Sequence, residues 1–218
     1  MASDVQICNI GLSYIGLGGI NSLTEDSPEA RVCNLHFAHE RDMLLEDFSY
    51  RFATGRQALA LQSVNDREEE WVYRYARPTG ILKMRWVQDI NVVRTLRARG
   101  EDISAPYQMA EGFVYTDIED AWCEFTNSET NPNEFPPFFQ DALSWGIAKS
   151  AAVSITEVQD RLEFAGAMYV RAKEKAEMSA LADEPQDSTV TADWLRERGF
   201  DRNREVGSRF GDFGLGPY

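Results

Sequence analysis

The spacing of apolar residues changes twice along this 218-residue chain, and this change constrains the fold more than any other feature. Near both ends, apolar side chains recur every three or four positions, which is the period of an amphipathic helix. Between about residues 50 and 126, aromatic and aliphatic residues alternate with other residues, which is the period of a strand. We therefore expect strands between two sets of helices.

Start and stop signals predict four helices. Ser3 with Gln6 and Thr156 with Gln159 have the spacing of capping boxes, and Ser27-Pro28-Glu29 combines an N-cap, a first-turn proline and an acid. Pro136-Pro137 opens a further helical pattern, and Gly16 ends the first one. The expected helices span about residues 4–15, 28–48, 137–155 and 157–180.

Four short runs alternate as strands do, and we expect them to pair within one small sheet. Residues 71–75 and 82–86 form the first pair, and residues 113–115 and 121–125 form the second. The predicted fold class is mainly α (α+β): a helical bundle with a small antiparallel β-sheet inserted between the N-terminal and C-terminal helices. One domain is expected over residues 1–182, followed by an extended C-terminal tail, 183–218, with a short helix at 194–198.

Composition excludes several functional classes. The net charge of −14 and the pI of about 4.6 leave no overall basic charge for phosphate binding or for attraction to anionic membranes. No run of ~18 apolar residues predicts a membrane span, and the N-terminal segment lacks the basic region of a signal peptide. The acidity is uneven, because residues 111–160 contain ten acids and a single base, Lys149.

Motifs for metal or phosphate binding are weak. His36 and His39 are three residues apart, whereas zinc-binding helices space their ligands by four, and the chain has no other histidine. Gly16–Gly19 follows a helix and not a strand, so we interpret it as a helix stop. Cys8, Cys33 and Cys123 match no ligand or disulfide pattern and are expected to be buried free thiols in a reducing cytoplasm. We therefore predict no cofactor and no metal.

Two patterns leave alternatives open. A basic stretch interleaved with aromatic residues is typical of single-strand grooves, but its arginines can equally pair with the acidic block, within the chain or on a neighbouring subunit. Its members are Arg74, Arg77, Lys83, Arg85, Arg94, Arg97 and Arg99, with Trp71, Tyr73, Tyr75 and Trp86. Paired carboxylates among Glu119, Asp120, Glu124 and Glu134 have the chemistry of a glycan hydrolase.

The N-terminal third of the chain resembles the tail tubular protein A, or head-to-tail adaptor, family of short-tailed bacteriophages. The residues that match its motifs are Leu12, Ile15-Gly16, Ile20, Ser22-Leu23, Glu25, Ser27, Ala30, Cys33, Arg41-Asp42, Leu44 and Phe52-Ala53. Weaker matches follow at residues 71–78, 114–117 and 135–142, so the resemblance covers about residues 7–175. Gly11 departs from the alanine that is usual in the family, as Thr79-Gly80 departs from its usual turn.

The resemblance implies a structural protein and not an enzyme. Such subunits form a ring, usually a dodecamer, at the head–tail junction of the virion after synthesis in the host cytoplasm. The implied partners are the portal protein, a tail nozzle like tail tubular protein B and further copies of the chain. Tail fibres are a further possible partner, and genomic DNA passes through as cargo.

Candidate contact residues follow from this role. Phe210, Phe213, Leu215 and Tyr218 are the expected portal anchors, because aromatic side chains concentrate binding energy. The expected subunit-interface residues are Arg74, Arg85, Arg94, Arg97, Glu119, Asp120 and Glu124.

Overall fold

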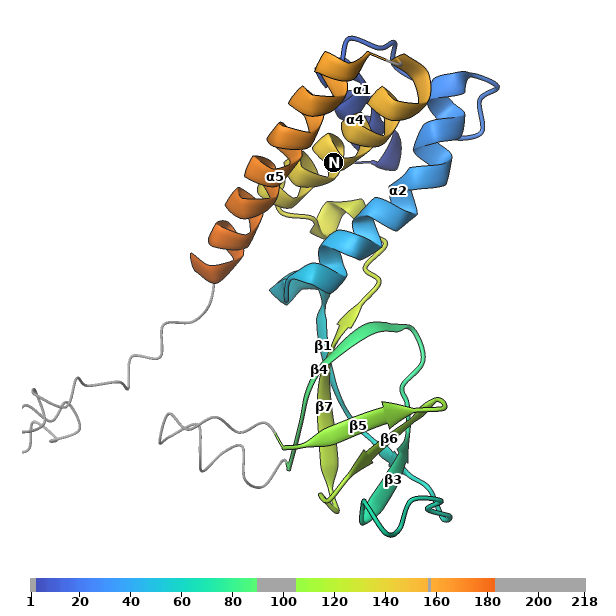
Figure 1. Ribbon diagram of the computed structural model, residues 1–218, viewed down its shortest axis with the longest axis vertical. Coiled ribbons are helices and arrows are strands. Elements are labelled where there is room, and N and C mark those ends of the chain that lie inside the picture. The colour runs from blue at the N-terminus through green and yellow to red at the C-terminus, as the bar shows by residue number, and fades with distance from the viewer. Residues whose placement is uncertain (1–2, 90–104, 157, 183–218) are drawn as a thin grey trace, which may run out of the picture. The chain divides into compact units, whose positions relative to one another are not determined.

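The computed structural model describes residues 3–89, 105–156 and 158–182 (Figure 1). The chain divides into two units, Met1–Glu184 and Pro185–Tyr218. The predicted tail with its short helix lies outside the described residues, as does the stretch 90–104. The α-helices of the described part are α1 (Asp4–Tyr14), α2 (Pro28–Asp47), α4 (Pro137–Ala151) and α5 (Gln159–Ala182).

The expectation of a helical bundle carrying one small sheet is wrong. The described chain is an α+β fold. Its two antiparallel sheets form a separate part of the structure beside the helices. One hydrophobic cluster lies among the helices, and a second is built from strand residues such as Val87, Val114 and Cys123. We call the two parts the helical layer (α1, α2, α4 and α5) and the β unit (the strands and connections within residues 54–89 and 105–127).

The first two helices begin directly after the serines that the sequence predicts as N-caps. The Ser3 hydroxyl accepts a hydrogen bond from the Gln6 N–H at 3.2 Å, and the Ser27 hydroxyl accepts one from the Ala30 N–H at the same distance. Gly16 has a φ of +73°, and the Leu17 N–H bonds back to the Leu12 carbonyl, so a left-handed residue ends α1.

Helix α4 is the centre of the helical layer and packs against α1, α2 and α5 (Figure 1). The approach of α1 is close at Gly11, where an added Cβ would lie 2.4 Å from the Ser144 carbonyl oxygen. The Ser144 hydroxyl donates to the Ile7 carbonyl at 3.1 Å across the same contact. Gly11 is therefore a packing residue, and its lower helix propensity is offset by the contact that it permits.

The connection between α4 and α5 differs from the prediction. Helix α4 ends at Ala151 and continues directly as the π-helix Ala152–Thr156, so the helical backbone does reach the predicted end near residue 155, but its wider last turn was not predicted. The expected capping box is wrong as well: the Thr156 hydroxyl donates to the Ala152 carbonyl at 2.8 Å, and the Gln159 amide donates to Glu163. The bond from the threonine hydroxyl to a preceding backbone carbonyl competes with the use of that hydroxyl as the cap of the next helix.

The strands form two sheets whose order does not follow the predicted pairs. The orders are β1–β7–β4 and β2–β3–β6–β5. The expected hairpin of residues 113–115 with 121–125 is wrong, because β6 and β7 belong to different sheets, as do β3 and β4. The strands are β1 (Thr54–Ala58), β2 (Ala60–Leu61), β3 (Tyr73–Ala76), β4 (Ile81–Asp89), β5 (Tyr107–Ala110), β6 (Phe113–Thr116) and β7 (Ala121–Asn127).

The two sheets enclose one core and are linked by a hydrogen bond between edge strands. Buried Tyr75 and Val114 come from one sheet, and Met84 and Phe125 come from the other. The Tyr107 hydroxyl donates to the Met84 carbonyl at 3.2 Å, which links edge strand β5 to edge strand β4. Burial on this inner face explains the period of two seen in the sequence.

Candidate functional site

Arg74, one of the predicted interface residues, has contacts for its guanidinium within its own chain. Its guanidinium lies 3.5 Å from the centre of the Phe113 ring, donates to the Val64 carbonyl at 3.2 Å and pairs with Asp66 at 3.4 Å. The Tyr115 hydroxyl donates to the same Asp66 carboxylate at 2.8 Å, which is the main reason that the pKa of Asp66 is lowered.

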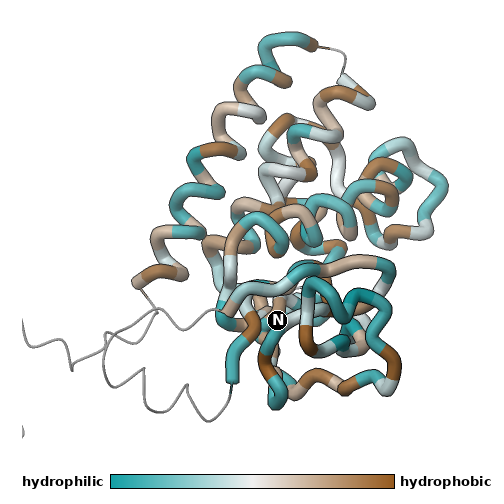
Figure 2. Tube along the Cα trace, turned by 60° about the horizontal axis from the view of Figure 1, so that its bottom comes forward, coloured by the Kyte–Doolittle hydropathy of each residue, from teal (hydrophilic) through white to brown (hydrophobic). Residues whose placement is uncertain are grey.

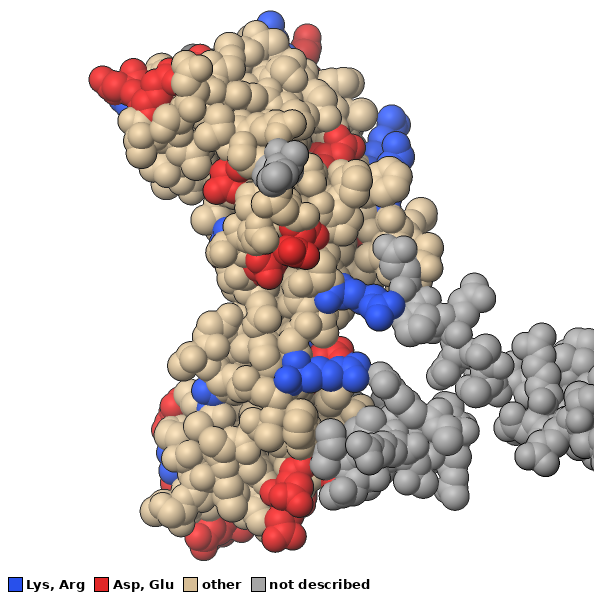
Figure 3. Space-filling model, turned by 180° about the vertical axis from the view of Figure 1, so that it is seen from behind, with Lys and Arg blue, Asp and Glu red and all other residues tan. Residues whose placement is uncertain are grey.

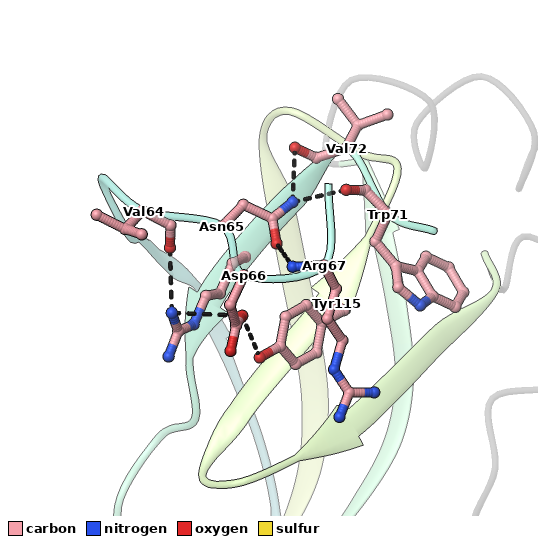
Figure 4. Close-up of polar contacts among 8 residues, drawn as sticks. Val64, Asn65, Asp66, Arg67, Trp71, Val72 and Tyr115 are labelled. Carbon is pink, nitrogen blue, oxygen red and sulfur yellow. Dashed lines mark hydrogen bonds and ion pairs between the residues drawn. The ribbon is translucent and has the colours of Figure 1, made fainter. Parts of the chain in front are cut away.

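These contacts belong to a clamp that holds the loop between β2 and β3 against the β unit (Figure 4). The Asn65 side-chain amide donates to the Trp71 carbonyl at 2.6 Å and accepts from the Arg67 N–H at 3.0 Å. Arg67 and the Trp71 indole both donate to the Gln108 side chain on β5. Two residues of the basic and aromatic stretch, Trp71 and Arg74, are thereby engaged in fixing the loop.

Arg85 joins the β unit to the helical layer. From β4 its guanidinium donates to the carbonyls of Leu45, Glu46 and Phe48 at 3.0, 3.0 and 2.9 Å, and to the Thr126 hydroxyl at 2.8 Å. The last carbonyls of a helix lack intrahelical partners and carry partial negative charge, so a cation here caps α2. Burial lowers the pKa of Arg85.

The acidic candidates are spread over the β unit and the segment before α4. Glu124 on β7 pairs with Arg56 on β1 at 2.5 Å, and the Arg56 guanidinium lies over the Trp86 ring. Glu119 and Asp120 are exposed in the connection between β6 and β7, and Glu134 is exposed ahead of α4. Arg94 and Arg97 lie outside the described residues. None of the contacts that Arg74, Arg85 and Glu124 make in the described chain requires a second subunit.

The acidic block of the sequence does not form one surface. Its acids are distributed over the turn between β5 and β6, the connection to β7, strand β7 and helices α4 and α5. Figure 3 shows red side chains in several separate places on the face that it presents. The acids that follow one another closely in residues 111–160 of the sequence therefore lie on several different elements of the folded chain.

A second polar clamp contains two of the residues that carry the family resemblance. Buried Arg41 donates to its neighbour Asp42 at 2.9 Å and to the Ser128 hydroxyl at 3.0 Å, while that hydroxyl donates to Asp42 at 2.9 Å. Ser128 directly follows β7, so this clamp is a second connection between α2 and the β unit. Arg41 and Asp42, which match the family motif, therefore hold α2 against the β unit.

A buried carboxylate lies between α2 and the α4–α5 pair. Glu40 is 5% exposed, accepts from the Ser150 hydroxyl at 2.9 Å and lies 3.4 Å from the Lys149 ammonium. A Cβ at Gly146 would lie 3.0 Å from its other carboxylate oxygen, so the glycine leaves space for the acid. Burial, with Glu40 nearby, raises the pKa of Tyr169 to about 12.

An apolar pocket of about 300 Å³ lies where η1 (Arg51–Ala53) meets α4 and α5, with Phe52, Phe138, Phe139 and Ala180 among its lining residues. Tyr50 also lines it, and the Tyr50 hydroxyl is buried without a hydrogen-bond partner among the described residues. Aromatic rings pack around the pocket, with the Tyr50 and Phe139 centres 5.0 Å apart. The arrangement suits an apolar side chain better than a polar substrate.

No cluster of three potential metal ligands occurs among the described residues; His36 on α2 is half-buried and His39 is exposed. All three cysteines are buried and free, as predicted. Within the described ranges, no helix is long and apolar enough to cross a membrane.

The sequence analysis missed an apolar face on α5. The inner face of this helix is the expected stripe of small residues, with Ala165, Ala172 and Ala176 buried. On the outer side Met178 is 68% exposed among charged residues, and at the edge of the helix Phe164 is 54% exposed although its ring lies 5.7 Å from that of Trp145 on α4. Figure 2 shows hydrophobic residues alternating with hydrophilic ones along the length of this helix. Charged residues lie between these apolar side chains in the sequence, so the helical period shows a single apolar stripe and does not reveal the second face.

No protein-family model matches the chain, and no curated protein matches it at a significant level.

Proposed function

We propose that this chain is a structural subunit of the head–tail junction of a short-tailed phage, where copies form a ring between portal and tail nozzle for the passage of DNA. The observation that carries the proposal is the second apolar face of α5. A helix that already buries one side against α4 and still exposes Phe164, Val170, Met178 and Leu181 has the character of an assembly subunit.

The contacts of the resemblance residues support the same proposal. Arg41 and Asp42 form a clamp to the segment after β7, Ser27 caps α2, and Cys33 lies in the helical core. Each of these residues stabilises the chain's own architecture. A motif made of such residues is one that a family of structural proteins would share.

The two alternative functions find less support in the geometry. A glycan hydrolase needs two carboxylates that face one substrate, but Glu124 is paired with Arg56, and Glu119 and Asp120 lie in an exposed connection. A single-strand groove needs accessible cations and aromatic rings, whereas Tyr75 is 1% exposed and Arg74 and Arg85 have partners in the chain.

Portal binding is the direct test. The purified full chain is mixed with purified portal rings of the same phage and analysed by sedimentation and by negative-stain microscopy. We expect the chain to sediment with the portal and to add a coaxial ring at one of its faces. A chain that stays in the unbound fraction at every ratio would refute the proposal, and release of reducing sugar from cell-wall glycan would favour the hydrolase.

A further inference from the structure

The two helices at the flanks of the helical layer carry matching outer faces. Helix α4 lies between α2 and α5, and both flanking helices run in the same general direction (Figure 1). Apolar side chains are exposed on each flank: Leu35 at 72% and Met43 at 52% on α2, and Phe164 at 54% on α5. Two different surfaces on opposite flanks are what a head-to-tail contact between identical subunits requires.

The order of charges along the two faces is complementary. On α2 the exposed Arg31 comes near the beginning and the exposed Glu46 near the end. On α5 the exposed Asp160 comes near the beginning and the exposed Lys175 follows in the second half. A parallel alignment of the two helices therefore brings opposite charges together at both ends, whereas an antiparallel alignment brings like charges together.

One register satisfies the apolar and the charged residues at once. Arg31, Leu35 and Glu46 have the same spacing as Asp160, Phe164 and Lys175, namely four residues and then eleven. At ~1.5 Å per residue these steps correspond to about 6 Å and 16 Å along either helix. Each set also lies within about 60° of the helix circumference at ~100° per residue, so its members share one face.

We propose that α2 of one copy packs in parallel against α5 of the next, with Arg31 beside Asp160, Leu35 beside Phe164 and Glu46 beside Lys175. This contact rests on the proposed ring and names the surfaces that form it. A rotation about an axis along the helices keeps them parallel from one copy to the next, so the same contact repeats until the ring closes. Arg31 also pairs with Asp26 in its own chain, but both side chains are largely exposed and the pair can be exchanged at little cost.

Charge exchange tests the register. Native mass spectrometry and sedimentation over a concentration series compare the wild-type chain with Arg31→Glu, Asp160→Arg and the double variant. We expect each single variant to associate about five- to tenfold more weakly, and the double variant to recover most of the loss. Unchanged far-ultraviolet circular dichroism shows that these exposed positions leave the fold intact. Single variants that associate as the wild type does, or a double variant that recovers nothing, would overturn the register.

Cross-linking tests the direction of the contact. In a chain that carries both Leu35→Cys and Phe164→Cys, a short bis-maleimide should yield a ladder of covalent dimers, trimers and higher oligomers. Each single variant has only one exposed thiol, because the native cysteines are buried, and should not extend beyond dimers. Val64→Cys with Phe164→Cys is the matched control, since Val64 is 66% exposed but lies outside the proposed contact.

The outcomes separate this contact from the proposed function. Rings in native mass spectra without a ladder from the Leu35 and Phe164 pair would refute the contact and leave the adaptor role intact. A chain that stays monomeric over the whole series and does not cross-link would also refute the contact. Portal binding then decides the adaptor role independently.

Discussion

Replacing Gly11 by alanine sets two physical effects against each other. In an isolated helix the change is favourable by about 1 kcal/mol, because alanine has the higher helix propensity. In this protein the new Cβ would lie 2.4 Å from the Ser144 carbonyl oxygen and 3.3 Å from the Ile147 Cβ. The nearest atom belongs to the backbone of α4, so a side-chain rotation cannot relieve the overlap.

The packing effect should be the larger one. Overpacking of a core typically costs about 1–3 kcal/mol, and a backbone obstacle places this site near the upper end. Moving α1 away also weakens the hydrogen bond from the Ser144 hydroxyl to the Ile7 carbonyl, which contributes about 1 kcal/mol. After the gain in propensity is subtracted, we expect a net loss of about 3 kcal/mol, or a decrease in Tm of about 6–12 °C.

Tryptophan fluorescence during urea denaturation measures this loss, because Trp145 on α4 stacks on Tyr14 at 4.1 Å and reports on the α1–α4 contact. Gly18→Ala is the matched control, since nothing lies within 4 Å of the position that its Cβ would take. The control should be neutral or slightly stabilising. A Gly11→Ala variant as stable as the wild-type protein, or more stable, would show that helix propensity outweighs the close approach.

Three further predictions concern other parts of the chain. Arg85→Met should lower the free energy of unfolding by about 2–3 kcal/mol in thermal denaturation, because α2 loses the cation that caps its carbonyls, while Lys83→Met should cost less, because the exposed Lys83 ammonium donates only one bond, of 3.3 Å, to the Glu46 carbonyl. The bond from Tyr115 lowers the pKa of Asp66, so its carboxylate stabilises the fold above the ordinary value of 3.8 and that stability is lost as pH falls through the lowered value. Urea denaturation at a series of pH values should therefore show less loss in Asp66→Asn below pH 3.8 than in the wild-type protein; equal slopes would contradict this. Deletion of residues 205–218 should leave circular dichroism and Tm unchanged but weaken sedimentation with portal rings, and normal binding would count against the proposed anchors.

Local signals in the sequence were sufficient where neighbours in the chain decide the structure. Ser3, Ser27 and Gly16 act within one helical turn of their own positions, and the first two helices begin and end close to these signals. Strands β3, β4, β6 and β7 were found for the same reason, because alternation is a property of consecutive residues, whereas β1, β2 and β5 were not predicted. The pairing of β6 with β3, and of β7 with β1 and β4, could not be predicted in this way, since it depends on residues that are far apart in the chain.

The sequence by itself determined the four α-helices of the described residues, the inner apolar side of these helices, and four of the seven described strands. Tertiary structure alone decided that the strands form two sheets around their own core, that Arg85 caps α2 and that the acidic block is dispersed. Gly11 illustrates the difference: its low helix propensity is visible in the sequence, but the carbonyl of Ser144 that requires a glycine belongs to a helix more than a hundred residues away. Propensity and period are local quantities, whereas packing and ion pairing depend on distances that exist only after the chain has folded.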